Sequence, residues 1–279
     1  MRETMPETEI YNNSDELAGA IPDGAKLAIF KDPGSPMEAV RALVRRGAKG
    51  LHLVTVPTGG MIADLLIGAG CVKIIESAGV SLGEFGPARE FANAVKSGSV
   101  EIKDSTCPAI YSGLQAGEKG IPFMPMRGLI GSDILKSRDD YETIENPFSK
   151  GDNIVVLPAI RPDIALIHVA LADRFGNLWV GRRLEYGIMA HAAHQTFVTA
   201  EKIIDENIME DEKLASGSIS SLYVTGIAPA PGGALPIAMP GHYEMDRRGL
   251  QNYAQASGSG ERFRRWLGDH VFSKSIAAE

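Results

Sequence analysis

Short apolar runs alternate with amphipathic segments along the first hundred residues of the chain. Three runs are typical of buried strands and three segments have the apolar spacing of helices, with the strands expected at 26–30, 51–56 and 72–75 and the helices at 36–46, 62–67 and 87–96. This alternation predicts βαβ units, and so an α/β fold with an open, mostly parallel sheet flanked by helices. Ligands bind such sheets outside the carboxyl ends of the strands, which makes the following loops the first candidate sites.

The helix expected at 36–46 has signals at both ends. Ser35 can act as its N-cap, Pro36 suits the first turn, and Glu38 stands where a capping box needs a carboxylate. Gly47 follows as a C-cap in the left-handed conformation. The sequence alone therefore predicts both ends of this helix.

The second half of the chain begins with a polar, turn-rich stretch at 136–153, which we interpret as a long connection within a single domain spanning 1–279. Further elements are then expected: strands at 154–157, 164–169 and 196–199, a helix at about 186–193, an irregular Pro- and Gly-rich loop at 228–241, and an amphipathic helical tail at 247–272.

Composition narrows the class of protein. Of 279 residues, 44% are hydrophobic and 23% charged, as in ordinary globular proteins, and the net charge of -7 argues against a general nucleic-acid binder. The polar N-terminus resembles no secretory signal, and no apolar run reaches the length of a membrane span. Cys71 and Cys107, the only cysteines, are expected to be buried, reduced thiols. We therefore expect a cytoplasmic protein without a membrane segment.

Several common motifs are missing. There is no P-loop, no GxSxG elbow and no HExxH, and Lys73 stands where a dinucleotide fingerprint starting at Gly68 needs its third glycine. The histidines at 168, 191 and 194 lack the spacing of a metal site. No metal is therefore predicted.

Three loops carry candidate chemistry. After the second strand, Gly59 and Gly60 precede a helix, where backbone N–H groups form either an anion or oxyanion site or a plain glycine turn. Glu76 and Ser77 end the third strand, where the carboxylate is either functional or a capping or surface group. In the loop at 120–133, Arg127 suits a carboxylate or phosphate, or else braces the loop in an Arg–Asp pair.

Several blocks, in order along nearly the whole chain, resemble the A (alpha) subunits of family I CoA-transferases, typified by glutaconate CoA-transferase. The blocks are IPDGAKLAIF from residue 21, DLLIGAG at 64–70, GLQAGEKGIPFMPMRGLIGSD at 113–133, LPAIRPDIALIHVALADRFGN at 157–177, VTAEKIID at 198–205 and APGGALPIAMPGHYEMD at 230–246. The resemblance implies the ribose-phosphate isomerase-like fold of these enzymes.

The resemblance also implies covalent catalysis. In two-subunit members a glutamate on the B (beta) subunit first attacks an acyl-CoA and becomes a glutamyl-CoA thioester, which a carboxylic acid then attacks. The equivalent turn here is 76–79, so Ser77 occupies the nucleophile position and Glu76 precedes it. CoA is then a substrate, and no metal or redox cofactor is implied. Gly59, Gly60, Arg127 and Gly131 are the candidate substrate-binding residues.

The chain departs from the family where a glycine pair usually follows the first strand. Phe30, Lys31 and Asp32 stand there instead, which puts the acyl group in doubt. Related A/B pairs hydrolyse a carbon–carbon bond in a CoA thioester of steroid-ring breakdown with an acidic A-subunit residue. That residue falls near Asp104, and Cys107 is an equal counterpart.

Three functions are thus carried forward from the sequence. The first is the A subunit of a hetero-oligomeric CoA-transferase acting on an acyl-CoA and a small carboxylic acid, with Glu76, Ser77 and Asp104 as candidate catalytic residues. The second is a ring-opening acyl-CoA hydrolase subunit. The third is a non-catalytic scaffold for the B subunit.

Overall fold

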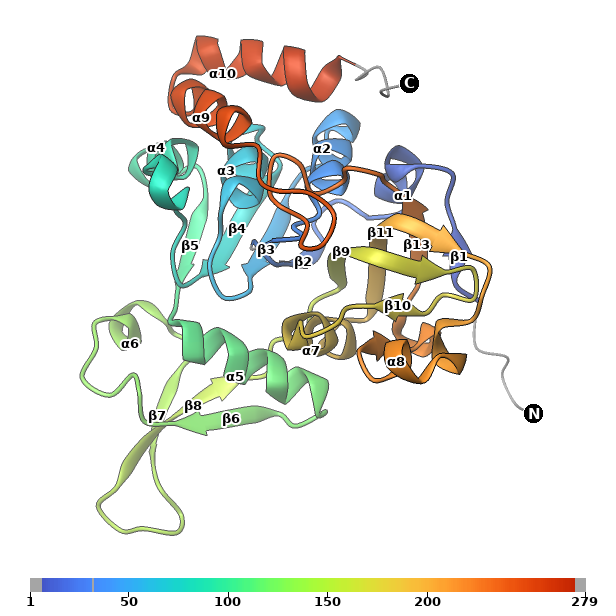
Figure 1. Cartoon of the computed structure of the whole chain (residues 1–279). Coiled ribbons are helices and arrows are strands. Elements are labelled where there is room, and N and C mark those ends of the chain that lie inside the picture. The colour runs from blue at the N-terminus through green and yellow to red at the C-terminus, as the bar shows by residue number, and fades with distance from the viewer. Residues whose placement is uncertain (1–6, 32, 274–279) are drawn as a thin grey trace.

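The computed structural model describes residues 7–31 and 33–273, and a mainly parallel sheet runs through it (Figure 1). The strand order is β1-β13-β11-β9-β2-β3-β4-β5, and β10 and β12 add antiparallel pairs beside β9. The bounds are β1 (Glu9–Ile10), β2 (Lys26–Ile29), β3 (Leu51–Thr55), β4 (Val72–Ser77), β5 (Glu101–Asp104), β9 (Ile164–Asp173), β10 (Leu178–Trp179), β11 (Gln195–Ile204), β12 (Ser218–Ile219) and β13 (Gly226–Pro229). The predicted α/β fold with a mostly parallel sheet is confirmed.

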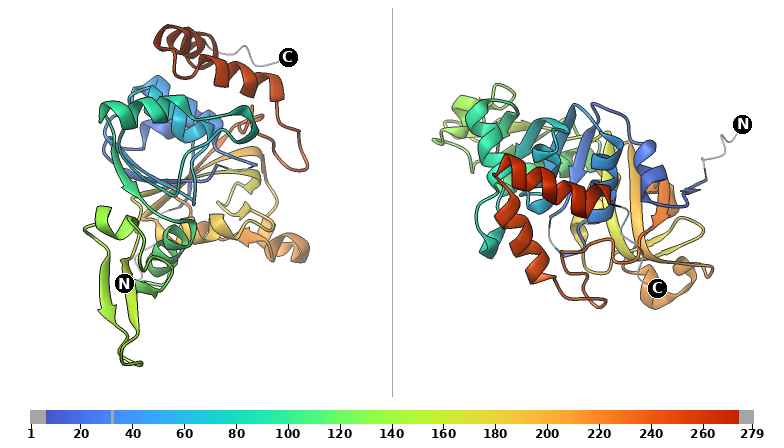
Figure 2. Two further views of the ribbon diagram at one scale, coloured as in Figure 1. Left: turned by 90° about the vertical axis from the view of Figure 1, so that its left-hand side faces the viewer. Right: turned by 90° about the horizontal axis from the view of Figure 1, so that it is seen from above.

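Helices cover both faces of this sheet (Figures 1 and 2). One face carries α1 (Ser14–Gly19), α2 (Met37–Arg46), α3 (Met61–Gly68), α4 (Arg89–Ser97), α9 (Arg247–Ala256) and α10 (Gly260–Leu267), and the other α5 (Cys107–Glu118), α7 (Leu184–Ala192) and α8 (Glu212–Ala215). A separate buried apolar cluster fills each face. No helix in the described ranges is long and apolar enough to cross a membrane.

The strands of the first half form where the apolar runs predicted them. β2 and β3 are almost wholly buried, as expected for strands covered on both sides. The start of α2 differs from expectation, because Pro36 takes the N-cap position and no side chain caps the helix. Glu38 instead contacts Arg41 and Arg45, so the capping box is wrong. Gly47 does end the helix in the left-handed conformation, with φ of 73°.

The stretch at 136–153 is more than a connection. It contains the end of α6 (Ile134–Ser137), the strand β7 (Glu142–Glu145) and the start of β8 (Asn153–Pro158). With β6 (Phe123–Met126), these strands form an antiparallel sheet in the order β6-β8-β7, which extends away from the large sheet (Figure 1). We refer to residues 121–158 as the small sheet. The prediction of an irregular loop at 120–133 is therefore also wrong where β6 forms.

The C-terminal helices are held to the sheet by a buried carboxylate. Asp64 of α3 is fully buried and accepts hydrogen bonds from the Phe91 amide (2.8 Å), the Tyr253 hydroxyl (2.8 Å) and the Ser257 hydroxyl (2.9 Å). Burial raises the pKa of Asp64, and the three donors oppose that shift. The predicted helical tail thus exists, but as two helices, and Asp64 links it to α3 through Tyr253 and Ser257.

Replacing Tyr253 by Phe is expected to lower the free energy of unfolding by about 1–3 kcal/mol, because a buried carboxylate loses a donor. Urea unfolding followed by circular dichroism measures the change. The matched control is Tyr11→Phe, which removes only an exposed hydrogen bond to Glu9 and should cost no more than about 0.5 kcal/mol. Equal losses in the two variants would contradict this account of the tail.

Candidate functional site

Three predicted residues meet at the carboxyl edge of β4 and β5. These strands pair in parallel, with Glu76 opposite Lys103 and Ser77 opposite Asp104. Because side chains alternate along a strand, Glu76 and Ser77 point to opposite faces of the sheet. The structure therefore brings Glu76, Ser77 and Asp104 together at one edge of the sheet, but each side chain has different surroundings.

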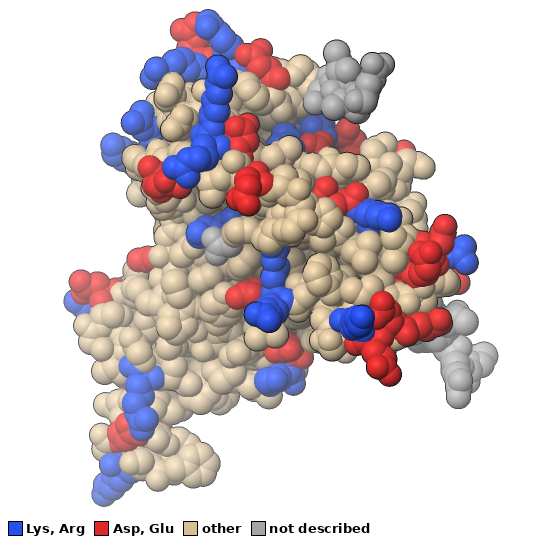
Figure 3. All heavy atoms as spheres, in the orientation of Figure 1, with Lys and Arg blue, Asp and Glu red and all other residues tan. Residues whose placement is uncertain are grey.

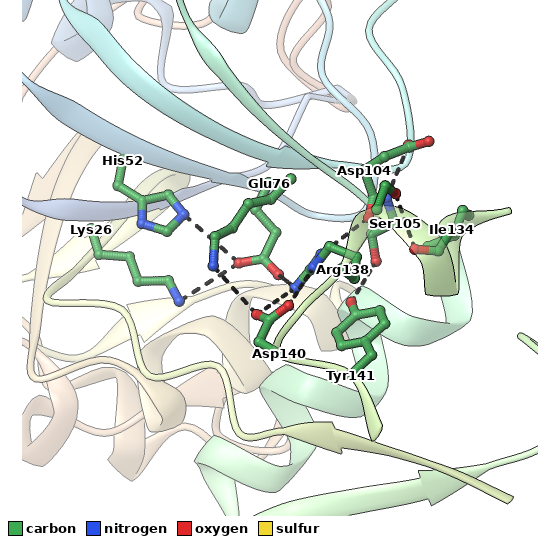
Figure 4. Close-up of polar contacts among 11 residues, drawn as sticks. Lys26, His52, Glu76, Asp104, Ser105, Ile134, Arg138, Asp140 and Tyr141 are labelled. Carbon is green, nitrogen blue, oxygen red and sulfur yellow. Dashed lines mark hydrogen bonds and ion pairs between the residues drawn. The ribbon is translucent and has the colours of Figure 1, made fainter. Parts of the chain in front are cut away.

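Glu76 lies in a buried ionic cluster that the sequence did not reveal (Figure 4). Its Oε1 accepts from Arg138 Nη2 at 2.7 Å, and both side chains are almost fully buried. Lys26 Nζ lies 3.6 Å and His52 Nε2 3.8 Å from Oε2 of the same carboxylate. The Glu76 carboxylate is thus neutralised by a residue of the small sheet.

Arg138 is satisfied on every side. Its Nε donates to Asp140 Oδ1 (2.7 Å), its Nη1 to the carbonyl of Asp104 (3.1 Å), and its guanidinium lies 3.9 Å from the centre of the Tyr141 ring. Burial lowers the pKa of Arg138, but the hydrogen bond with Asp140 and the charge of Glu76 outweigh it and raise that pKa overall. Burial likewise raises the pKa of Asp140, and Arg138 overcomes this and lowers it to about 2.

His52 has a different role in the cluster. Its Nε2 is buried without a hydrogen-bond partner, and burial, followed by the charge of Lys26, lowers the pKa of the imidazole to about 4. His52 is therefore neutral at physiological pH and adds no positive charge beside Glu76. Lys26 and Arg138 supply the compensating charge.

Ser77 is bound into a tight turn at the end of β4. Its hydroxyl accepts from Thr55 Oγ1 (2.6 Å) and from the Gly79 amide (3.1 Å). The Gly59 amide donates to the Gly79 carbonyl at 2.8 Å, and a Cβ added to Gly59 would lie 2.8 Å from the Ala63 Cβ. Gly59 is thus required by close packing, and its N–H is already used within the protein.

Gly60 forms the N-cap of α3, directly beside the loop that follows β2. The amides of the first turn of this helix point toward the carboxyl edge of the sheet. A Cβ at Gly60 would lie 3.3 Å from the Lys31 Cβ, so the side chain of Lys31 packs over this helix start. Phe30 is buried edge-on against Tyr186, whereas Asp32 lies outside the described residues.

Asp104 is exposed at the end of β5, and its carboxylate accepts only from the neighbouring Ser105 amide (3.0 Å) within the described residues. Ser105 Oγ lies 3.0 Å from the Tyr141 hydroxyl, which ties this edge to the small sheet. Cys107 is exposed at the start of α5, so only Cys71 is buried as expected. Of the two predicted carboxylates, Asp104 is therefore accessible and Glu76 is buried.

Arg127 and Gly131 lie on the small sheet, away from the residues that surround Glu76. Arg127 donates to Asp152 through Nε (3.1 Å) and Nη2 (2.5 Å), and its side chain is 69% exposed. Gly131 occupies a turn with φ of 78°. Arg127 thus forms an Arg–Asp pair, but with Asp152 outside the loop at 120–133, whereas Asp133 of that loop contacts Lys136.

A second polar cluster lies on the other side of β2 and was missed from the sequence. Buried His168 of β9 contacts Thr199 Oγ1 through Nδ1 and Glu201 Oε1 through Nε2, both at 2.9 Å. Glu201 of β11 also accepts from the Gly232 amide (2.7 Å) and from the Tyr243 hydroxyl. Burial raises the pKa of Glu201, and the donors His168 and Tyr243 outweigh it, so that the pKa is lowered.

This second cluster fixes the Pro- and Gly-rich loop, which begins after β13 rather than at 228. A Cβ at Gly233 would lie 2.6 Å from His168 Cε1, so the loop packs directly on the imidazole. The available signal was Glu201, the carboxylate that directly follows the buried run of β11 at 196–200. No group of three or more metal-ligating side chains occurs in the described ranges.

The chain is an α/β protein, and in open sheets of this kind ligands bind outside the carboxyl ends of the parallel strands. The chain belongs to the Coenzyme A transferase family, which it matches over residues 11–219. It is 32% identical over 246 residues to the A (alpha) subunit of the 3-oxoadipate CoA-transferase from Pseudomonas knackmussii, covering 85% of this chain and 83% of the relative. The resemblance seen in the sequence is thus confirmed.

Two further similarities bear on the function. The crystal structure of glutaconate coenzyme A-transferase from Acidaminococcus fermentans superposes with a TM-score of 0.88 at 27% identity, covering 95% of this chain and 89% of that one. The chain is also 26% identical over 269 residues to the cholesterol ring-cleaving hydrolase IpdA subunit of Rhodococcus jostii, covering 92% and 90%. The relatives of this chain therefore include a protein named for a second chemistry.

Changing either Glu76 or Arg138 to Gln is expected to lower the free energy of unfolding by up to about 3–5 kcal/mol, because the remaining charge stays buried after losing its shortest ion pair; Arg138 then keeps Asp140, and Glu76 keeps Lys26. The double variant should lose clearly less than the sum, and urea unfolding of all four proteins measures this coupling. The control cycle is Arg127→Ala with Asp152→Ala, an exposed pair expected to couple by less than about 1 kcal/mol. Additive losses at Glu76 and Arg138 would refute the pairing.

The Asp140–Arg138 contact should make stability fall in acid. Asp140 has a folded pKa of about 2, below the unfolded value of about 3.9, so its contribution is complete above about pH 5 and is lost progressively as the pH falls through 2. Urea midpoints measured from pH 2 to 7 should show a shallower acid slope in Asp140→Asn than in the parent. Parallel profiles would mean that Asp140 does not titrate against Arg138.

Proposed function

We propose that this chain is the A subunit of a two-subunit enzyme that transfers CoA from an acyl-CoA to a small carboxylic acid, with the nucleophilic glutamate on the B subunit. The single observation that carries this division of labour is the Glu76–Arg138 pair. A nucleophilic carboxylate must be free to reach the thioester carbonyl, whereas Glu76 is buried and bound to a guanidinium. Ser77 occupies the nucleophile position and is hydrogen-bonded into its turn.

The proposed reaction proceeds through acyl exchange on the partner glutamate. The carboxylate attacks the thioester, CoA thiolate leaves, and an acyl anhydride forms; the thiolate then attacks the glutamyl carbonyl and releases the first acid. The acceptor carboxylate attacks the resulting glutamyl-CoA and displaces the thiolate, which finally takes the new acyl group and regenerates the glutamate. Each step develops an oxyanion, so donors at the site lower the barriers.

In this mechanism the chain contributes the surroundings of the reacting atoms. The start of α3 at Gly60 supplies backbone N–H groups and the positive end of a helix dipole for an anion or oxyanion. Gly59 shapes the turn rather than donating, because its N–H already binds Gly79. Arg127 and Gly131 fit a supporting role on the small sheet, with Arg127 holding Asp152.

Ring-opening hydrolysis is the second candidate, favoured by Asp104 and by the similarity to the IpdA subunit. An exposed carboxylate without a cationic partner in the described part of the chain can accept a proton from water or from the substrate. This reaction needs water but no acceptor acid. Dependence on the acid therefore separates the two candidates.

A B-subunit partner is supported by uncovered apolar surface. Figure 3 shows charged side chains gathered over the C-terminal helices, while much of the middle of this face carries none. Several large apolar side chains are exposed, among them Phe148 (95%), Leu184 (77%) and Leu222 (62%). Where exposed apolar side chains form a contiguous patch, they are candidates for a partner interface. We propose a hetero-oligomer in the cytoplasm.

Turnover of a panel of acyl-CoAs by the purified A/B pair, with acetate present or withheld, tests this proposal. We expect strict dependence on acetate, with acetyl-CoA appearing. Borohydride added with acyl-CoA should reduce a glutamate of the partner to an alcohol, detected by peptide mass spectrometry. Conversion without an acceptor acid would support hydrolysis, and a label on this chain would overturn the assignment of the nucleophile.

The Asp104→Ala variant complements the turnover assay. Asp104 is exposed, so the substitution should not unfold the protein. We expect a loss of less than about tenfold in kcat for a transferase and of at least about 100-fold if Asp104 is the acid or base of a hydrolase. Unchanged turnover in Ser77→Ala and Asp104→Ala together would support the scaffold function instead.

A further inference from the structure

A small cavity lies at the same edge of the sheet, on the far side of β2 from Glu76. Its volume is about 230 Å³, and it opens between β9, the turn at 179–183 and the loop around Met239. Trp179, Tyr186 and Met239 provide apolar walls, with His168 among the lining residues. No acidic residue lines it within the described chain, whereas Arg182 and Arg183 both do. The lining of the cavity is therefore mainly apolar and carries two arginines.

Arg183 is the half-buried cation of this cavity. Its Nη1 donates to the Tyr186 hydroxyl at 3.0 Å, and that hydroxyl donates to the Gly34 carbonyl at 2.8 Å. The guanidinium lies 5.5 Å from the centre of the Tyr186 ring. In the described part of the chain Arg183 takes part in no ion pair, in contrast to Arg138, which binds two carboxylates. Its remaining donors are available to a ligand.

The loop after β2 is built to accommodate this guanidinium. Gly34 has φ of 86°, and a Cβ there would lie 2.0 Å from Arg183 Nη1, so only glycine allows the contact. The Gly34 amide donates to the Ala238 carbonyl at 2.8 Å, which joins this loop to the Pro- and Gly-rich loop. Lys31 of the same loop packs over the start of α3 at Gly60. The cavity is thus adjacent to the proposed reaction site.

We propose that this cavity is a subsite for a small aliphatic carboxylate and that Arg183 is its specificity-determining residue. The inference rests on the proposed function, in which both the acceptor acid and the far end of an acyl group can carry such a carboxylate. A guanidinium presents two parallel N–H donors that match a carboxylate, and the apolar walls suit a short carbon chain. The volume is below the 300–1,000 Å³ typical of sites for drug-sized ligands, which favours a small acid over a fused ring system.

His168 and Glu201 keep the cavity in shape. Glu201 holds His168 from one side and the Gly232 amide and Tyr243 hydroxyl from the other, so the loop that carries Met239 is attached to the sheet. These residues are positioning residues, because the ionic Glu201 faces its donors rather than the cavity. Arg183 remains the residue that contacts the ligand.

The test uses the A/B complex and three variants: Arg183→Gln, Arg183→Lys and, as a matched control, Arg174→Gln on the β9–β10 turn. Kinetic constants are measured with butyrate and glutarate as acceptors and with butyryl-CoA and glutaryl-CoA as donors. Binding of butyrate and of uncharged butyramide to the complex is measured by calorimetry. Circular dichroism and thermal midpoints establish that the variants are folded.

We expect Arg183→Gln to raise the KM and Kd of the acid by about 10- to 100-fold with kcat changed by less than about threefold, as for loss of an interaction made equally in the ground and transition states. The KM and Kd of Arg183→Lys should lie between those of the parent and of Arg183→Gln. The binding of butyramide should be the same in all variants. If only glutaryl-CoA is affected among all substrates, the subsite holds the far end of the acyl group. Unchanged constants for acids and donors alike would overturn the subsite.

The proposed function and this subsite can fail separately. A complex that transfers no CoA but binds butyrate in an Arg183-dependent manner would retain the subsite and lose the transferase function. A complex that transfers CoA with constants indifferent to Arg183 would retain the function and lose the subsite. An equal effect of Arg174→Gln would show that the response reflects net charge, and would also reject Arg183.

Discussion

The carboxyl edge of the large sheet depends on one buried ion pair, between Glu76 of β4 and Arg138 of the small sheet. Removing two charges from water costs several kcal/mol each, so such a pair persists only where every remaining donor and acceptor is satisfied. Here Asp140, the Asp104 carbonyl and the Tyr141 ring complete the shell around Arg138. The ends of β4 and β5 are thereby joined to Arg138, which lies 62 residues from Glu76 and 34 residues from Asp104 along the chain.

A similar arrangement recurs on the other side of β2. There the carboxylate is Glu201, and its donors come from β9 and from the loop after β13. The two clusters flank β2, where strand order changes direction, since β3 follows on one side and β9 on the other. At such a switch point the loops from neighbouring strands diverge and leave room for a ligand. A carboxylate with several donors thus holds the structure on each side of this switch point.

The sequence predicted those parts of the fold whose signal is local. β2, β3 and β9 are largely apolar runs because they are covered on both faces, and such runs can be recognised in the sequence without knowledge of the neighbouring strands. β7 could not be found in this way, because all four of its residues are exposed and its position is set by pairing with β8. Arg138 was missed for a related reason: in sequence it is one charge in a polar stretch, and its burial depends on Glu76, far away in the chain.

On the function proposed here, the cost of an unpaired buried carboxylate also explains why the reaction site is shared between two chains. A glutamate that attacks a thioester must keep its carboxylate unpaired until substrate arrives, whereas the folding of this chain requires its own glutamate at β4 to be paired with Arg138. One residue cannot meet both demands, because a free buried carboxylate would cost more than the edge can compensate. In a pair of homologous subunits, one copy of the edge can be stabilised by an ion pair and the other left reactive. The structural role of Glu76 therefore explains why this half of the enzyme would supply donors and a cation rather than the nucleophile.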